Sequence, residues 1–285
     1  MSKDRNRNAW ISKGLVFGAL VMLFVATMAS VGVVAAEMGD IVASFGAPPG
    51  VNDDLAWDGK YLWCVGNDKI YKIDTNGNAI ASFDSPGIEA LTYDGKYLWG
   101  AGEDGIYKLD TNGNLIATFQ FPDNYYVPVT ASILGLTYDG EYLWCYRHLI
   151  VYGSPSESKL LKRDVSDRDV SIISEIDECT PCYGLAWDGK YLWGSGGGSD
   201  RKIYKFDTNC NPIASFHSPG TYAILGLTCD GKYLWCLSYD AYIYKVGIGK
   251  AASSERDSSE EVPGFESLLA IVGLLAVAYL LRRRK

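Results

Sequence analysis

LAWDGKYLW, at Leu55–Trp63, is the first of five near-copies of one phrase. The other copies are LTYDGKYLW (Leu91–Trp99), LTYDGEYLW (Leu136–Trp144), LAWDGKYLW (Leu185–Trp193) and LTCDGKYLW (Leu227–Trp235). Their Asp-Gly pairs follow one another at steps of 36, 45, 49 and 42 residues. A period of this size, with several short strand-like runs in each unit, is typical of β-propeller blades.

Each unit contains four predicted strands joined by tight turns. In the first unit the strands are Leu55–Trp57, Tyr61–Val65, Ile70–Asp74 and Ala79–Phe83. Asp58-Gly59 and Asn76-Gly77 separate two pairs of them, and such dipeptides favour hairpins because the turn needs positive φ. The strands are apolar on both faces, as expected for a sheet that is buried between two neighbouring blades.

A second motif supports five blades and indicates how the ring closes. Fourth strands are predicted at Ile80–Phe83, Ile116–Phe119, Ile172–Ile176 and Ile213–Phe216, but none follows Ile243–Val246 in the last unit. The missing strand is found before the first unit, at Ile41–Phe45. We therefore expect an all-β, five-bladed β-propeller over residues 37–247, closed by its N-terminal strand, which removes open sheet edges. An open solenoid is the alternative, and it leaves Ile41–Phe45 unexplained.

Both ends of the chain carry hydrophobic segments that we expect to be helical. Basic residues at 3–13 precede an apolar run at 14–36, the layout of a secretory signal peptide over residues 1–36. The run is also long enough to stay as an N-terminal membrane helix. Either interpretation predicts that the propeller is exported.

The C-terminal end has three parts in order. A polar stretch, residues 248–262, is expected to form a disordered stalk. Pro263-Gly264-Phe265 then precedes an apolar segment, Leu268–Leu281, and a basic end at Arg282–Lys285. Residues 263–285 resemble the PGF-CTERM sorting signal of archaeal surface proteins. The resemblance implies that an archaeosortase removes the tail and that a membrane lipid anchors the protein, with the propeller outside. A plain C-terminal membrane helix is the alternative.

The net charge of the part of the chain between its two terminal segments restricts the kinds of partner that we expect. The whole chain has a formal net charge of −8, and its two terminal segments, 1–36 and 266–285, each carry +3, so residues 37–265 carry −14. A domain this acidic repels phosphate backbones, and we expect no nucleic-acid partner.

The seven cysteines do not suggest a full disulfide framework. Cys64, Cys145 and Cys236 follow the tryptophan of the second strand, where two other copies have glycine, and a small buried residue suits that position. The spacing of Cys179 and Cys182 predicts a local disulfide, with reduced thiols or half of a zinc site as alternatives.

Motifs for metal or nucleophilic chemistry are weak. The runs at Asp74 and Asp110 resemble the start of a calcium loop, but they lack its later glycine and glutamate. Hairpin chemistry explains them, so we expect no cofactor and no metal, with calcium as the alternative. The sequence contains no Gly-x-Ser-x-Gly and no His-Glu-x-x-His motif.

Position in the propeller gives a better site prediction than motifs. The Asp-Gly and Asn-Gly turns share one face, so the uneven loops at 121–133, 146–158, 177–183 and 217–222 share the other, where binding residues usually lie. The ligand-binding candidates are Asn52, Asp53, Asp54, Glu89, Tyr125, Tyr126, Arg147, His148, Tyr152, Tyr183 and Tyr222. Tyrosines beside carboxylates suit polar ligands such as glycans, because the ring stacks while its hydroxyl bonds.

Two functions are compatible with these features of the sequence. The first is a surface-anchored, non-catalytic propeller for adhesion, envelope assembly, or binding of a glycan or protein. The second follows from a resemblance, because the repeat phrases over residues 50–246 are similar to those of glutaminyl cyclase-like five-bladed propellers. That resemblance implies a peptide cyclase, for which Glu89 is the candidate proton-transfer group. The shared phrases are largely scaffold, so they indicate fold more than activity.

Overall fold

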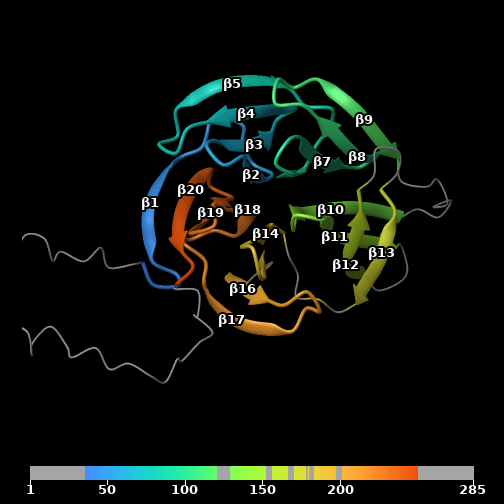
Figure 1. The fold of residues 1–285 in the computed structure, drawn as a ribbon. Coiled ribbons are helices and arrows are strands. Elements are labelled where there is room, and N and C mark those ends of the chain that lie inside the picture. The colour runs from blue at the N-terminus through green and yellow to red at the C-terminus, as the bar shows by residue number, and fades with distance from the viewer. Residues whose placement is uncertain are drawn as a thin grey trace, which may run out of the picture. The chain divides into compact units, whose positions relative to one another are not determined.

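The computed structural model describes residues 36–120, 129–151, 156–165, 170–177, 179, 183–196 and 201–249, and in this part of the chain it is all β. The described residues form five antiparallel four-stranded sheets, which are arranged around one axis as the blades of a propeller (Figure 1). This confirms the predicted fold and the predicted number of blades.

Each blade is numbered here by the repeat that it contains, and its strands run from the axis outward. Blade 1 contains β2 (Leu55–Trp57), β3 (Leu62–Gly66), β4 (Lys69–Ile73) and β5 (Ala79–Asp84). Blade 2 contains β6 (Ala90–Tyr93), β7 (Leu98–Gly102), β8 (Gly105–Leu109) and β9 (Leu115–Gln120). Blade 3 contains β10 (Val129–Tyr138), β11 (Tyr142–Val151), β12 (Glu157–Asp164) and β13 (Ile172–Asp177). Blade 4 contains β14 (Leu185–Trp187), β15 (Leu192–Ser195), β16 (Lys202–Phe206) and β17 (Pro212–His217). Blade 5 contains β18 (Ile224–Cys229), β19 (Tyr233–Ser238), β20 (Tyr242–Gly247) and β1 (Ile41–Gly46).

The N-terminal strand closes the ring as predicted. β1 pairs antiparallel with β20, with Ile41 opposite Val246 and Gly46 opposite Tyr242. Phe45 on β1 packs against Trp235, with ring centroids 6.2 Å apart. The last blade is therefore assembled from both ends of the propeller.

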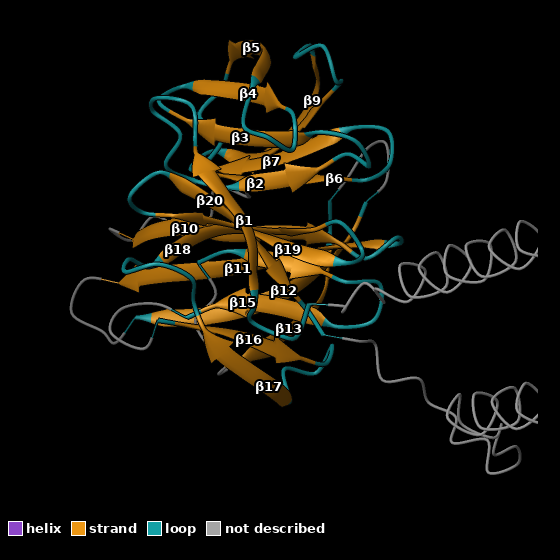
Figure 2. Cartoon of the chain, turned by 90° about the vertical axis from the view of Figure 1, so that its left-hand side faces the viewer, coloured by secondary structure: helices purple, strands orange, loops and turns teal. Residues whose placement is uncertain are grey.

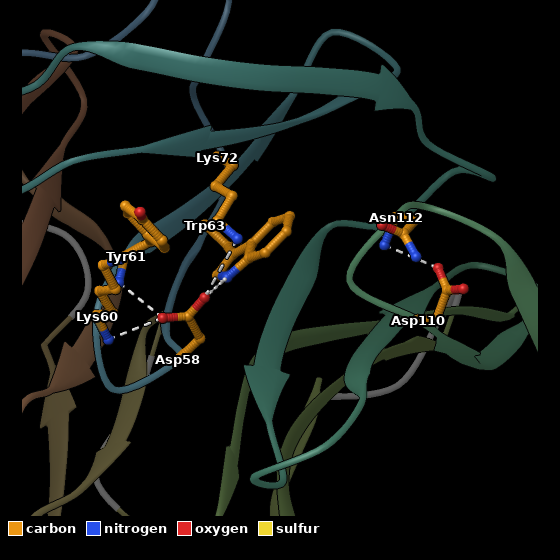
Figure 3. Close-up of polar contacts among 7 residues, drawn as sticks. All are labelled: Asp58, Lys60, Tyr61, Trp63, Lys72, Asp110 and Asn112. Atoms are coloured by element: carbon orange, nitrogen blue, oxygen red, sulfur yellow. Dashed lines mark hydrogen bonds and ion pairs between the residues drawn. The ribbon is translucent and has the colours of Figure 1, made fainter.

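The repeated phrase is explained by a hydrogen-bond network around its aspartate. In blade 1 one oxygen of Asp58 accepts the backbone N–H groups of Lys60 and Tyr61, at 2.8 and 2.6 Å, which fixes the turn (Figure 3). The other oxygen accepts the indole Nε1–H of Trp63 at 2.8 Å, and Lys72 Nζ lies 3.8 Å away from it. The same Asp–Trp bond recurs at Asp94, Asp139, Asp188 and Asp230. These residues therefore hold each blade together, which supports the interpretation of the phrase as scaffold.

The core lies between blades. One buried cluster combines Trp63 and Val65 of blade 1 with Leu91, Leu98 and Tyr107 of blade 2, and four similar clusters involve the other blades. This arrangement explains why both faces of each strand are apolar in the sequence.

Outer strands also contact the next blade around the ring. Figure 2 shows the described part of the chain from the side, drawn as strands and loops. Phe83 at the end of β5 lies over Gly113 in the turn between β8 and β9, and Phe45 lies in the same way over Gly77. A Cβ at Gly113 would approach the Phe83 ring to 2.4 Å, and this glycine also has φ of +87°. Glycine is needed at this position for both reasons.

The predicted disulfide is wrong in its pairing. Cys179 is bonded to Cys210, whereas the sequence spacing favoured Cys182, which lies outside the described residues. Cys210 occupies the glycine position of the turn between β16 and β17, with φ of +62°. β13 of blade 3 has Ile176 near its end where other outer strands have phenylalanine, and Cys179 follows it. The disulfide thus joins blades 3 and 4 at the place where a Phe–Gly contact joins other blades.

The free cysteines Cys64, Cys145 and Cys236 are fully buried, as the sequence predicted for a small apolar position. Burial raises the pKa of each of these thiols, because the charged thiolate is disfavoured away from water. We therefore expect them to be chemically inert in the folded protein.

Blade 3 differs from the expected pattern. Its first hairpin is longer than those of the other blades, because β10 and β11 pair from Tyr138 and Leu143 to Val129 and Val151, with one register shift between Ile133 and Gly135. Arg147 and His148 were expected in a loop at 146–158, and that placement is wrong because both lie within β11. His148 Nδ1 is 2.8 Å from Ser158 Oγ on the neighbouring strand β12.

The predicted signal peptide, stalk and C-terminal segment lie outside the described residues. Within the described ranges, the structure contains no helix of the length and hydropathy needed to cross a membrane.

Candidate functional site

Strand direction divides the propeller into two faces. The "turn face" carries the Asp-Gly turns between the first and second strands and the turns between the third and fourth strands. The "loop face" carries the connections between blades and the loops between the second and third strands. The site predicted from the sequence belongs to the loop face, where it surrounds the axis.

Five equivalent residues surround the axis on the loop face, and we call them the axial mouth. They stand two places before the leucine that begins each repeated phrase: Asp53, Glu89, Leu134, Tyr183 and Leu225. Three of them are tied to the second strand of their own blade, since the N–H groups of Asp53, Glu89 and Tyr183 donate to Val65, Ala101 and Ser195. The mouth is therefore acidic at blades 1 and 2 and apolar or aromatic at blades 3, 4 and 5.

Asp54 closes the axis directly below the mouth. Its exposed fraction is 0%, and its carboxylate accepts the N–H groups of Leu55 at 2.8 Å and Leu91 at 2.9 Å. The N–H of Leu227 contributes a further bond, so three innermost strands meet at one side chain. The equivalent positions in the other blades hold Ala90, Gly135, Gly184 and Gly226, and a Cβ at Gly226 would lie 2.7 Å from Asp54. Asp54 was a predicted ligand-binding residue, but the structure places it out of reach of a surface ligand.

Burial and repulsion between like charges raise the pKa values of the two carboxyl groups at the mouth, Asp53 and Glu89. Partial burial, followed by repulsion from Glu89 and Asp68, raises the pKa of Asp53 to about 6. Burial and then the charge of Glu103 raise the pKa of Glu89. Desolvation raises the pKa of Asp54 well above its ordinary value, although its backbone hydrogen bonds oppose that shift. Negative charge thus accumulates at this end of blades 1 and 2, and a positive or hydrogen-bond-donating ligand group would relieve the repulsion.

Three exposed tyrosines lie in loop-face segments of blades 4 and 5. Tyr183 (39% exposed) precedes β14, Tyr222 (49%) precedes β18, and Tyr239 (69%) follows β19. The rings of Tyr222 and Tyr239 are 6.4 Å apart and tilted by 35°, so the two form one aromatic surface. An aromatic surface beside carboxylates can stack on a sugar ring or an apolar group while it accepts hydrogen bonds from polar ones.

The remaining predicted residues divide into two groups. Asn52 is exposed next to the mouth and packs on Gly66, where a Cβ would lie 2.4 Å from its Oδ1. Arg147 and His148 are partly buried on β11. Tyr125, Tyr126 and Tyr152 lie outside the described residues.

Sequence reasoning missed Tyr239, Leu134 and Leu225. Tyr239 lies in a loop of only three residues between β19 and β20, and its short length gave no signal of a site. The two leucines resemble core residues in the sequence, although their alignment with Asp53 and Glu89 in the repeat would have placed them at the mouth.

Hydrogen bonds within the described turns account for the aspartates that suggested calcium. Asp74 accepts the backbone N–H groups of Asn76 and Asn78 and the side-chain amide of Asn78, at 2.8–2.9 Å. Asp110 accepts the backbone N–H of Asn112 at 2.8 Å (Figure 3). It also accepts the backbone and side-chain N–H groups of Asn114, at 2.9 and 2.8 Å. Over the ranges that the structure describes, no group of His, Cys, Asp or Glu side chains is arranged to hold a metal ion. The aspartates of these turns are thus explained by turn formation.

Comparison with known proteins bears on the end of the chain. Residues 262–284 match the PGF-CTERM motif. This confirms the resemblance drawn from Pro263, Gly264 and Phe265, and the motif indicates an exported protein that is anchored in the membrane at the cell surface. It is consistent with processing by an archaeosortase and with a lipid anchor at the C-terminus.

The comparisons with curated proteins and with solved structures do not identify a function. No curated protein matches the sequence. A chain in the crystal structure of the mitotic checkpoint complex is 11% identical and has a TM-score of 0.46, over 76% of this chain and 94% of that chain. A likeness of this size carries no argument about function. The similarity to glutaminyl cyclase-like propellers is not confirmed.

The acidic mouth predicts an unusual dependence of stability on pH. Because the pKa of Asp53 is higher in the folded protein, its contribution to stability is complete below its ordinary pKa and is lost as the pH rises through about 6. We expect this contribution to the melting temperature to be lost between about pH 4 and about pH 6.5, a window that runs from the ordinary pKa of an aspartate to the raised pKa of Asp53. Asp53→Asn should flatten this dependence and raise the melting temperature at neutral pH by about 2 °C.

The control for this measurement is Asp104→Asn, which changes an exposed carboxylate of the same face between β7 and β8. It should leave the slope of melting temperature against pH unchanged. An unaltered slope in the Asp53 variant would contradict the assignment.

Proposed function

We propose that this protein is a surface-anchored, non-catalytic propeller whose loop face binds a polar ligand, with a glycan as the favoured class. The observation that carries the proposal is that one face of the propeller carries both exposed tyrosines, Tyr183, Tyr222 and Tyr239, and the interacting carboxylates of Asp53 and Glu89. Rings supply flat apolar contact, and carboxylates accept hydrogen bonds from sugar hydroxyl groups. The PGF-CTERM motif supports presentation of this face at the cell surface.

Adhesion or envelope assembly is the role that this arrangement serves best. A rigid ring with loops of uneven length on one face offers a broad contact surface. An archaeosortase and a membrane lipid are the partners proposed for the C-terminus, and a protein ligand is the alternative to a glycan at the loop face.

The rival function is a peptide cyclase with Glu89 as the proton-transfer group. Its raised pKa favours this role. Against it, Glu89 is exposed, and the tryptophan that ends each copy of the repeated phrase bonds to an aspartate of the turn face rather than lining the mouth. Cyclisation of a peptide with an N-terminal glutamine that is lost in Glu89→Gln would favour the rival and contradict the non-catalytic proposal.

A glycan array tests the binding proposal. We expect the protein to bind a restricted set of glycans, and Tyr222→Ser with Tyr239→Ser to weaken binding by about tenfold or more, since loss of stacking on two rings removes roughly 1–2 kcal/mol. The matched control, Tyr222→Phe with Tyr239→Phe, keeps both rings and should retain most of the affinity. Equal binding by the serine and wild-type proteins would place the site elsewhere.

A further inference from the structure

An aliphatic residue stands at a β-bulge on the outer strand of every blade. In each of these strands the register with its neighbour shifts by one residue, so one residue has no partner across the ladder. The unpaired residues are Val42, Ile80, Ile116, Ile173 and Ile213, and we call them the apolar belt. Each is about half exposed, between 47% and 52%.

The fold does not require aliphatic side chains at these five positions. Because a bulged residue is outside the ladder, cross-strand packing does not select a β-branched side chain there. The residue two places further along is serine or threonine in four blades: Ser44, Ser82, Thr118 and Ser215. Polar residues are thus accepted on these outer strands, yet the belt is aliphatic each time. Exposed aliphatic side chains that recur in every blade, although packing within the fold does not require them, indicate a surface that contacts another molecule.

The belt lies close to the turn face. In blades 1 to 4 its members follow the turns between the third and fourth strands by a few residues. In all five blades they lie beside the last residues of the third strand, such as Ile73 in blade 1 and Val246 in blade 5. Since they are equivalent positions around one axis, they lie at the same height along it. A ring of apolar side chains perpendicular to the axis matches a flat partner better than a curved one.

Both ends of the described propeller emerge from this face. Gly39 donates its N–H to Gly247 O at 2.9 Å, so the chain enters and leaves the propeller at neighbouring points. Gly247 lies opposite Tyr233, which follows the Asp-Gly turn of blade 5. The anchoring motif begins at residue 262, and residues 250–261 span at most about 40 Å in any conformation. The anchor therefore keeps the turn face near the membrane at high effective concentration, where a weak contact is sufficient for docking.

Charge favours the same orientation. Four Asp-Gly turns present an exposed lysine on the turn face: Lys60, Lys96, Lys190 and Lys232. Each amine lies 4.7–5.0 Å from the ring of the next tyrosine, which holds it at the tip of its turn. The loop face instead gathers the carboxylates around Asp53 and Glu89. Anionic headgroups attract the lysines and repel the acidic mouth, although Asp74, Asp110 and Asp207 in the turns between the third and fourth strands oppose part of this attraction.

We infer that the turn face of the propeller lies on the membrane, with the apolar belt among the lipid headgroups and the loop face turned outward. The inference rests on the surface anchoring of the proposed function and deepens it, because it fixes which face is free to bind. The partner is the lipid surface. A second copy of the chain, packed edge to edge, is the competing occupant of the belt.

Amine labelling of the full chain in vesicles tests the orientation. The protein is reconstituted at low density in vesicles of equal parts phosphatidylcholine and phosphatidylglycerol, isolated by flotation, and treated with a membrane-impermeant amine reagent. Mass spectrometry then compares each lysine with the same chain in detergent. We expect the four turn-face lysines to react about threefold less in vesicles, since tethering keeps the face docked. Lys69, on the loop face, should react equally in both.

Variants of the belt decide the cause of protection. Threonine at all five belt positions keeps β-branched side chains, and it should restore the reactivity of the turn-face lysines in vesicles. The matched control changes Ser44, Ser82, Thr118 and Ser215 to alanine and should keep them protected. Circular dichroism and melting confirm that both variants are folded.

Three outcomes would overturn the inference. Turn-face lysines that react equally in vesicles and detergent would exclude docking, and protection of Lys69 would reverse the orientation. Protection that appears only at high protein density would assign the belt to contacts between copies. If the chain did not float with the vesicles, the membrane anchoring itself would be contradicted. A glycan array without binding would contradict the proposed ligand class, and it would not affect the result on orientation.

Discussion

Deletion of Asp40–Phe45 is expected to lower the melting temperature by more than about 15 °C, or to prevent folding. These residues form most of β1, which pairs with β20 along its length, and Phe45 covers Trp235. Without the strand, blade 5 has three strands, its outer edge is unpaired and the ring is open at one junction. The deletion therefore removes several hydrogen bonds and a buried aromatic contact together.

A control separates ring closure from the loss of one contact. Phe119 on β9 packs on Trp99 with centroids 5.8 Å apart, much as Phe45 packs on Trp235, but its blade is continuous in sequence. Phe119→Ala should cost roughly 2 kcal/mol, or about 4–8 °C, because the ring is only partly buried. A peptide of residues 37–47 added to the deletion variant should recover part of the lost stability. A deletion that melts within a few degrees of wild type would contradict closure by β1.

Local turn chemistry explains why the fold was predictable from the sequence. Each repeat carries its own hairpin signals, and Asp58 shows why they recur, since one carboxylate fixes both the turn and the tryptophan. The missing fourth strand after Val246 and the extra strand at Ile41 then determined the closure. The blades required only patterns within about forty residues, whereas closure required a comparison of the two ends of the repeat region, and the structure confirms both.

The misplaced features depend on contacts between blades or on strand register. Cys179 bonds to Cys210 because the end of one outer strand meets the turn of the next blade, and sequence spacing does not report that contact. Arg147 and His148 were placed in a loop because charged residues interrupt the apolar pattern, yet the strands of blade 3 continue through them. The bulges that expose Val42 and Ile80 are one-residue register shifts, which the pattern of the sequence does not reveal.

The candidate site was predicted in part. Asp53, Glu89 and Tyr183 were found because their place in the repeat puts them at the axis. Tyr239 was missed because its loop is short, and Asp54 was placed on the surface because sequence alone does not distinguish it from Asp53. These two adjacent carboxylates differ completely in burial, and that difference yields the second large prediction.

Asp54→Ala is expected to destabilise the protein by about 3 kcal/mol at neutral pH, because it leaves the N–H groups of Leu55 and Leu91 buried without an acceptor. In a propeller of this size the corresponding fall in melting temperature is about 6–12 °C. Relief from burying a carboxylate offsets part of this loss, but three innermost strands lose their common acceptor at the same time. Thermal melting followed by circular dichroism measures the effect.

The adjacent carboxylates allow an internally controlled comparison. Asp54→Asn puts an amide N–H₂ group against a backbone donor and should lower the melting temperature, although less than alanine does. Asp53→Asn removes repulsion from Glu89 and Asp68 and should raise it. Opposite signs at neighbouring positions would identify Asp54 as the residue that joins the blades at the axis and Asp53 as the one available to a ligand. If Asp54→Ala instead raised the melting temperature, the buried carboxylate would be a strained group, and its retention would have to be explained by function rather than by the fold.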